Sequence, residues 1–366
     1  MKERKLKLAI IGTNGIPANY GGFETLVEFL AQYLSHEFEI TVYCSSKIMD
    51  SNLELYKGVK LKYIKLSANG WQSIFFDFLS LFSSYKAFDK ILILGCSGSI
   101  FQPLFKSFSH KIIMNIGGLD WQRSKWNFFT RKFLKFSEKL AIKYSGTIVS
   151  DNQGIYEYIL AEYDRPSVII AYGGDQAFNV SAENSDFEKF KFLNDPYAFT
   201  VARIQPDNNI ELLCSSFDSN SSFPLVIVGN WSNSKFGISI KKLYQDVPNL
   251  VLLDAIYDQR ELNLLRSNCY IYLHGHSAGG TNPALVEAMN LGLPIFAYNN
   301  TFNRYTTQNK ARYFSDSISL KRILNDTKLD ELEQISIDML NIAKLEYKWS
   351  TISSGYSAII NFSTVL

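Results

Sequence analysis

Apolar and polar positions along the chain follow two alternating patterns. Short apolar runs such as residues 6–12 are rich in β-branched side chains and end in Gly or polar residues, which is typical of buried parallel strands. Between such runs lie segments such as residues 23–34, whose apolar side chains stand at helical spacing. Strand, helix and strand within the first 44 residues predict a βαβ unit.

This alternation continues along the chain and is interrupted near residue 175. Before the break, strands are predicted at residues 6–12, 39–44, 90–95, 111–115, 146–150 and 168–171, and a basic amphipathic helix at 127–143. After it, strands are predicted at residues 198–202, 225–229, 250–254, 270–274 and 293–297. We therefore expect an α/β fold of two Rossmann-like domains, 1–173 and 174–349, facing across a cleft that holds the ligand.

Composition narrows the class of protein. The chain has 366 residues, 46% of them apolar and 20% charged, which suits two globular domains. A net charge of +2 argues against a general nucleic-acid binder. Four dispersed cysteines, with no Cys/His cluster, indicate a reducing cytoplasm and no structural zinc. Neither a signal peptide nor a spanning segment is predicted.

The first candidate site is the glycine-rich loop at residues 12–24, between a predicted strand and a predicted helix. Gly15, Gly21 and Gly22 leave room for close backbone approach, and the free N–H groups at the helix start suit a diphosphate. The loop lacks the GxGxxG pattern, and no acidic residue ends the second strand, so an NAD oxidoreductase is disfavoured. A plain βα turn is the alternative.

The second candidate site is the segment at residues 274–292. Asn282 suits an N-cap, Pro283 the first helical position and Gly292 the residue past the helix end. The helix start would offer a second anion site, built from Gly280, Thr281, Asn282 and Ala284. Glu287, one turn further, could reach a ribose. His274 and His276 flank this loop, each as an ordinary structural histidine or a catalytic one, and His276 is also a candidate donor contact.

Arg203 follows the predicted strand 198–202, in a loop expected to face the cleft. A guanidinium there could clamp phosphate oxygens, although an exposed surface arginine is the alternative. No DxD-like metal motif accompanies these phosphate sites. We therefore expect a metal-independent reaction that uses no cofactor.

Together these segments resemble a known family. The loop 12–24, residues 115–126 and the His274–Met289 segment resemble the retaining GT-B glycosyltransferases of family four, in particular rhamnosyltransferases of bacterial surface polysaccharides. Residues 347–356 resemble that family's last helix, which implies a C-terminal helix at about 350–366 crossing back to the first domain. The wider family carries two glutamates eight positions apart. Glu287 matches the second and Gly279 stands at the first, and the family's phosphate-binding lysine has no counterpart in residues 206–209.

The resemblance implies a hexosyltransferase that uses a nucleotide-diphosphate sugar, retains anomeric configuration and glycosylates a saccharide or a lipid-diphosphate-linked acceptor. Arg203 and Glu287 are the expected catalytic residues, and Asp120 is the first-domain candidate for contact with the reacting sugars. A nucleotide-sugar epimerase of the same fold and a non-catalytic sugar-nucleotide-binding protein remain alternatives.

A basic aromatic stretch spans residues 121–143. It contains seven Lys and Arg residues, interleaved with Trp and Phe, and a single acidic residue, Glu138. It predicts either an ordinary solvated helix with its aromatic face packed inward, or attachment to an anionic membrane surface. The second interpretation would place a cytoplasmic enzyme peripherally on the inner face of the plasma membrane.

Overall fold

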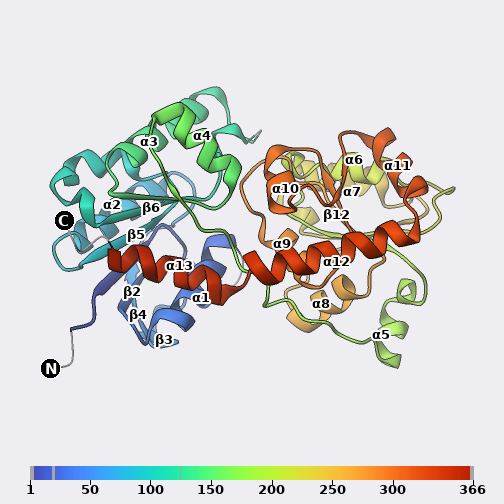
Figure 1. The fold of residues 1–366 in the computed structure, drawn as a ribbon, viewed down its shortest axis with the longest axis horizontal. Coiled ribbons are helices and arrows are strands. Elements are labelled where there is room, and N and C mark those ends of the chain that lie inside the picture. The colour runs from blue at the N-terminus through green and yellow to red at the C-terminus, as the bar shows by residue number, and fades with distance from the viewer. Residues whose placement is uncertain (1–3, 19–20, 124, 363–366) are drawn as a thin grey trace. The chain divides into compact units, whose positions relative to one another are not determined.

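The computed structural model describes residues 4–18, 21–123 and 125–362. The chain divides into two compact units (Figure 1). The first unit runs to Gln122, resumes from Trp126 to Tyr172 and takes in the C-terminal segment that begins at Trp349. The second comprises Gly173–Lys348, with the short segment Arg123–Lys125 grouped with it.

The first unit is built on an eight-stranded sheet in the order β3-β4-β2-β1-β5-β6-β7-β8. The strands are β1 (Lys7–Ile11), β2 (Glu39–Ser45), β3 (Leu55–Tyr56), β4 (Val59–Ile64), β5 (Lys90–Leu94), β6 (Ile112–Ile116), β7 (Thr147–Ser150) and β8 (Val168–Ile169). All neighbours are parallel except the short β3–β4 hairpin. The central strands β1, β5 and β6 are buried almost throughout, which explains their nearly unbroken apolar sequence.

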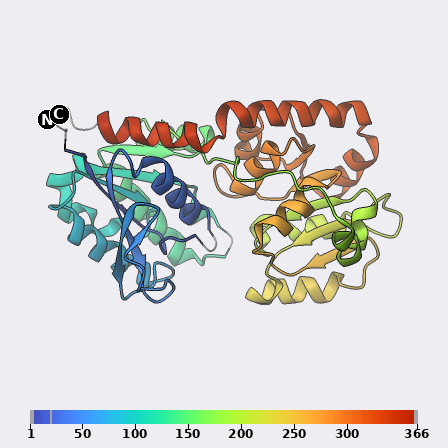
Figure 2. The same cartoon turned by 90° about the horizontal axis from the view of Figure 1, so that it is seen from below.

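Helices cover both faces of this sheet (Figures 1 and 2). They are α1 (Gly22–Leu34), α2 (Gln72–Ser84), the 3-10 segments η1 (Ser99–Lys111) and η2 (Asp120–Gln122), α3 (Phe128–Lys143), α4 (Gln153–Tyr163) and α13 (Trp349–Phe362). The strand order reverses at β1, so right-handed crossovers put α1 on one face and α2, η1 and α3 on the other. The helix α13 packs on α1, where Trp349 stacks on Phe29 with ring centroids 4.3 Å apart.

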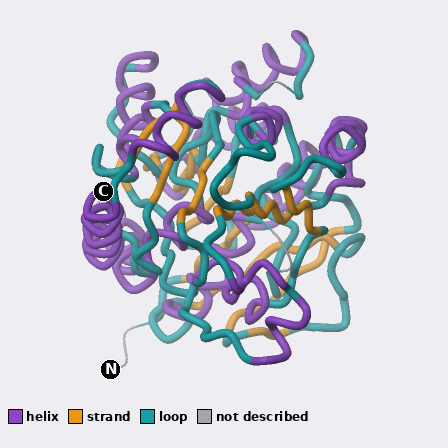
Figure 3. Tube along the Cα trace, turned by 90° about the vertical axis from the view of Figure 1, so that its right-hand side faces the viewer, coloured by secondary structure: helices purple, strands orange, loops and turns teal. Residues whose placement is uncertain are grey.

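The second unit is built on a six-stranded parallel sheet in the order β11-β10-β9-β12-β13-β14. Its strands are β9 (Ala198–Val201), β10 (Leu225–Val228), β11 (Leu250–Leu253), β12 (Ile271–His274), β13 (Ile295–Tyr298) and β14 (Arg312–Phe314). Its helices are α5 (Asn184–Lys189), η3 (Lys191–Asn194), η4 (Pro206–Asn208), α6 (Ile210–Ser215), η5 (Trp231–Asn233), α7 (Lys235–Tyr244), α8 (Gln259–Ser267), α9 (Pro283–Asn290), α10 (Thr301–Thr306), α11 (Ser317–Asp326) and α12 (Leu329–Glu346). Helices and loops surround the strands (Figure 3).

Every strand predicted from an apolar run is present, within one or two residues, and α3 begins one residue after the predicted start. The hairpin β3–β4 and the edge strand β14 had no comparable signal, because their side chains are half exposed. Within the described part of the chain, no helix is both long and apolar enough to cross a membrane.

Candidate functional site

The loops that follow β9 and β12 are tied together at the carboxyl edge of the second sheet. These two strands are neighbours, so the chain leaves both at the same edge. The backbone N–H and the hydroxyl of Ser277 both donate to the Asp207 carbonyl, each at 2.8 Å. The Asn209 side chain donates to the Gly275 carbonyl at 2.8 Å. This edge is where ligands bind in open α/β sheets.

Arg203 lies in the first of these loops and is exposed. The loop is stiffened from within, because Asn208 Nδ2 donates to the Arg203 carbonyl at 2.7 Å. The guanidinium also lies close enough to His276 to influence its protonation: burial first, and then the charge of Arg203, lower the pKa of that imidazole to about 3.

His274 and His276 stack on each other, with ring centroids 4.4 Å apart and an interplanar angle of 11°. Burial holds the pKa of His274 well below its usual range, so both rings are neutral at physiological pH. In the described structure neither nitrogen of His274, nor Nδ1 of His276, has a hydrogen-bond partner. The fully buried His274 supports the loop, whereas His276 retains some exposure and offers a neutral imidazole next to Arg203.

The start of α9 has the predicted cap. Asn282 Oδ1 accepts from the Ala284 N–H at 3.0 Å, and Pro283 occupies the first helical position. Gly292 follows the helix end with a φ of +67°, as the sequence indicated. The Ala284 amide, predicted as a donor contact, is thus engaged by the cap. The predicted anion-binding positions that precede it are Gly280 and Thr281, of which Thr281 is buried.

Gly279, which precedes these positions, has a φ of +114°. A Cβ built there would meet no atom within 4 Å. The glycine is therefore required by backbone conformation and not by crowding. Gly279 stands where the family has its first glutamate, and any side chain at this position would strain the backbone.

Glu287 is held by two residues that the sequence did not single out. Arg266 on α8 forms an ion pair with Glu287 Oε2 at 2.7 Å, and its side chain is only 3% exposed. Gln176 Nε2 donates to Glu287 Oε1 at 2.6 Å. A buried guanidinium needs such a partner. The signal that could have found Arg266 is its place directly after the apolar residues Leu264 and Leu265 of α8.

In the first unit, the glycine-rich loop has structural reasons for its glycines. Gly15 has a φ of +115°, and a Cβ there would lie 2.5 Å from the Cys44 sulfur. The Asn14 backbone and side-chain nitrogens both donate to Glu24 Oε1 at 3.1 Å. Gly21 and Gly22 stand at the start of α1, where no side chain caps the helix. Residues 19 and 20 of the predicted motif lie outside the described residues.

Arg203, His276, the start of α9 and Glu287 all belong to the second unit, and the charge of Arg203 acts on His276. Gly15, Gly21, Gly22 and Asp120 belong to the first unit, where Asp120 is exposed at the start of η2. Participation of the first-unit residues in binding stays a prediction.

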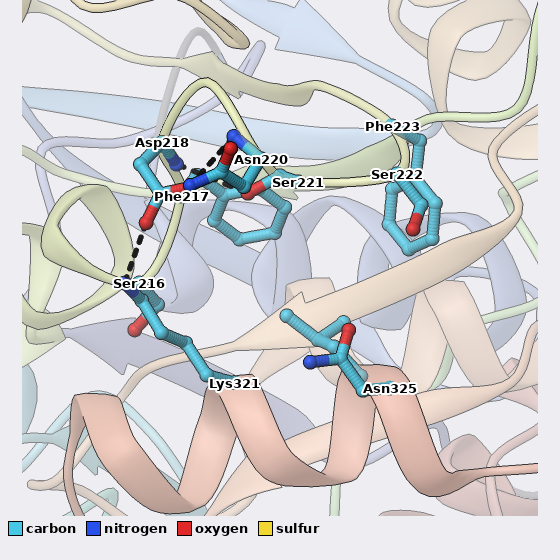
Figure 4. Close-up of a pocket in the computed structure, with 10 residues that line it drawn as sticks. Ser216, Phe217, Asp218, Asn220, Ser221, Ser222, Phe223, Lys321 and Asn325 are labelled. Atoms are coloured by element: carbon cyan, nitrogen blue, oxygen red, sulfur yellow. Dashed lines mark hydrogen bonds and ion pairs between the residues drawn. The ribbon is translucent and has the colours of Figure 1, made fainter.

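Two further features do not add to this site. Over the described ranges, no cluster of three or more His, Cys, Asp or Glu side chains could hold a metal ion, and all four cysteines are free thiols. A pocket of about 150 Å³ lies between the segment 216–223 and α11 (Figure 4). Its polar groups bind one another, as in the Lys321–Asp218 ion pair at 2.8 Å. Because the segment 216–223 leads into β10, the pocket lies at the amino edge of the sheet.

Each half of the chain matches a different protein family. Residues 5–175 match the family described as domain of unknown function DUF1972. Residues 181–329, which hold Arg203, His276 and Glu287, match the family described as glycosyl transferases group 1. The second half of the chain is thus similar to a glycosyltransferase domain, which supports glycosyltransferase activity. No curated protein shows a significant sequence match to the chain.

Solved structures show that the chain has the GT-B fold. Sucrose-phosphate synthase from Thermosynechococcus elongatus is 15% identical, with a TM-score of 0.80 over 98% of this chain and 99% of that one. Anabaena HepE in complex with UDP and glucose is 12% identical, with a TM-score of 0.74 over 98% and 100%. The trehalose 6-phosphate synthase from Burkholderia multivorans is 10% identical, with a TM-score of 0.71 over 98% of each chain.

Proposed function

We propose that this chain is a retaining glycosyltransferase that moves a hexosyl unit from a nucleotide-diphosphate sugar to a lipid-linked or oligosaccharide acceptor. Rhamnose is the candidate sugar, bacterial surface polysaccharide synthesis the candidate process and the cytoplasm the candidate compartment. One observation carries the proposal. The loop that holds Arg203 and the loop that leads into α9 follow neighbouring strands and are hydrogen-bonded to each other. Glu287 on α9 is paired with the buried Arg266, and all three residues lie in the segment that matches glycosyl transferases group 1.

The donor would bind through its diphosphate and its ribose. Arg203 supplies a planar guanidinium for the phosphate oxygens, and the start of α9 supplies backbone N–H groups and the positive end of the helix dipole. Glu287 would accept hydrogen bonds from the ribose hydroxyls. The complex of HepE with UDP and glucose supports a nucleotide donor for a chain of this fold.

The chemical barrier is departure of the nucleoside diphosphate from an oxocarbenium-like sugar. A fixed guanidinium and fixed helix N–H groups stabilise the developing charge without rearranging during the reaction. The acceptor would attack from the face that the diphosphate leaves, and its proton would pass to the departing phosphate, so that configuration is retained. Glycines 15, 21 and 22 and the Asp120 carboxylate are the proposed first-unit contacts.

We propose that the reaction needs no metal ion, because arginine and backbone N–H groups neutralise the leaving diphosphate. Activity should be unchanged, within about twofold, after dialysis against EDTA. Loss of activity in EDTA, with recovery on adding Mg²⁺, would overturn this part of the proposal and leave the sugar transfer intact.

The decisive experiment incubates the full chain with a panel of nucleotide sugars, with and without a lipid-diphosphate-linked acceptor. Nucleotide release should require both substrates, and product NMR should show the donor's anomeric configuration. Turnover of donor without acceptor would indicate an epimerase. Binding without any release, across the whole panel, would indicate a non-catalytic binding protein.

A further inference from the structure

The helix α2 differs from an ordinary surface helix, because it buries polar side chains beside Phe76 and Leu81 and also exposes large apolar ones. Its buried positions include three serines and an aspartate: Ser73, Ser80, Ser84 and Asp77. Its exposed positions are large and apolar, with Phe75 48% exposed, Leu79 42% and Phe82 58%, and Trp71 just before it is 71% exposed. A water-facing helix shows the opposite distribution.

The buried serines do not need a polar partner elsewhere. The Ser80 hydroxyl donates to the Phe76 carbonyl at 2.7 Å, and the Ser84 hydroxyl to the Leu81 carbonyl at 3.1 Å. Small satisfied side chains let the helix lie close to the sheet. Large apolar side chains remain outside, where water gives them no favourable contact.

The exposed rings of α2 adjoin partly buried rings of the neighbouring segment η1. Phe75 lies 6.3 Å from both Trp71 and Phe101, and Phe78 lies 4.6 Å from Phe101, measured between ring centroids. At the far end, Tyr85 lies 5.9 Å from Phe82 and 4.9 Å from Phe108. Leu104 on η1 is 71% exposed. We call this continuous surface, residues 71–85 and 101–108, the aromatic ridge.

The helix α3 lies on the same face of the sheet as α2 and η1, and it packs against η1. There Phe128, Phe129 and Phe136 are exposed, so the interpretation of residues 121–143 as a helix with every aromatic packed inward is wrong. Lys135, however, is only partly exposed and already has partners. Its ammonium forms an ion pair with Glu162 at 3.1 Å and lies 4.7 Å from the Trp121 ring.

Within the ridge segments and α3, the exposed charged side chains are cationic. Lys86, Lys106, Lys132 and Lys139 are exposed. In residues 71–111 and 128–143 the acidic side chains are Asp77, Asp89 and Glu138. Asp77 and Glu138 are buried, and Asp89 accepts from Arg4 at 2.6 Å. An apolar surface bordered by these lysines suits an anionic lipid surface.

We infer that the aromatic ridge is a membrane-docking surface, on which Trp71, Phe75, Phe82 and Leu104 enter the headgroup region of a bilayer while the surrounding lysines contact anionic lipids. Aromatic and leucine side chains on one face with lysine around them are the features of proteins that lie in the bilayer interface. The inference does not depend on the sugar transfer, and either can fail without the other.

The test is flotation of the full chain with vesicles of phosphatidylcholine, alone or with 30% phosphatidylglycerol, at low and high salt. We expect binding to the anionic vesicles that weakens with salt. The variant Trp71→Ser/Phe82→Ser should bind at least fivefold less, and Lys86→Gln/Lys106→Gln should lose the preference for anionic lipid. The matched control is Ile238→Ser/Leu243→Ser on α7, which removes equally exposed apolar side chains and should bind like wild type.

Unfolding midpoints in urea establish that each variant is folded, and lipids brominated in their acyl chains should quench tryptophan fluorescence in wild type but not in Trp71→Ser/Phe82→Ser. Absence of flotation with every vesicle would overturn the inference. So would equal losses in the ridge and control variants. Sedimentation equilibrium showing a dimer that the ridge substitutions dissociate would instead assign the surface to a second copy of the chain.

Discussion

Arg203 is the residue whose side chain has the most direct proposed contact with the donor phosphates. Arg203→Ala should lower kcat/KM by about 10–100-fold, because hydrogen bonds to charged groups contribute about 1.5–3 kcal/mol each. Arg203→Lys should recover only part of this loss, since it keeps the charge and loses the planar fork. Steady-state kinetics measure both, with the exposed Arg322→Ala as control. Wild-type kinetics in Arg203→Ala would exclude the proposed role.

Glu287 has two neighbours that complicate its substitution. Glu287→Gln should weaken nucleotide binding at least about tenfold, and should also cost about 1.5–3 kcal/mol of stability because the buried Arg266 loses its charged partner. Arg266→Gln is the matched control: it breaks the same ion pair and leaves the carboxylate in place. Calorimetric titration with nucleoside diphosphates should show a clearly larger loss for Glu287→Gln. Equal losses would mean that Glu287 has only a structural role.

The loop before α9 depends on the backbone conformation of one residue, Gly279. Gly279→Ala adds a Cβ that touches nothing within 4 Å, so its effect isolates the strain of a φ of +114°, about 1–3 kcal/mol. The loop should shift and nucleotide binding should weaken by about 5–100-fold. Gly70→Ala is the control, because Gly70 has a φ of +68° and equally open surroundings in the first unit. It should bind nucleotide like wild type, and normal binding by Gly279→Ala would show that the loop conformation is dispensable.

The helix α2 carries a pH dependence of its own. Burial raises the pKa of Asp77 to about 7, above about 3.9 in an unfolded chain. Between these values the folded protein keeps a proton that the unfolded chain has lost, so the Asp77 contribution to stability falls as the pH rises from about 4 to 7 and stays low above.

Asp77→Asn removes this titration and can still accept from Ser97, whose hydroxyl lies 3.2 Å from Asp77 Oδ2. Urea unfolding at pH 4.5 and 7.5 should therefore show the variant gaining stability relative to wild type at the higher pH. A difference between the two proteins that does not change with pH would refute the assignment.

The C-terminal helix α13 belongs to the first unit, although the rest of that unit comes from the N-terminal half of the chain. Trp349 is 1% exposed and stacks on Phe29 of α1. Trp349→Ala should therefore destabilise the protein by about 3–5 kcal/mol. Leu345→Ala, only four residues earlier and 75% exposed, should change stability by less than about 0.5 kcal/mol. Comparable unfolding midpoints for the two variants would argue against a structural role for α13.

The parallel sheets and the capped start of α9 could be predicted from the sequence. Strands buried on both faces must be apolar throughout, so β1, β5 and β10 are visible as apolar runs. The cap at Asn282 and the turn at Gly292 were also predictable, because capping and positive φ depend on single residue types.

The ion pairs of the charged side chains and the burial of the apolar ones could be learned only from the tertiary structure. The Arg266–Glu287 pair joins residues 21 positions apart, and Lys135 lies among the rings of Trp121 and Tyr158 although its sequence position suggested an exposed cation. Apolar periodicity shows that α2 has two faces, but which face meets the sheet depends on packing, and here the serines are inside. Local patterns record backbone preferences, whereas burial and ion pairing depend on neighbours that folding brings together from distant positions.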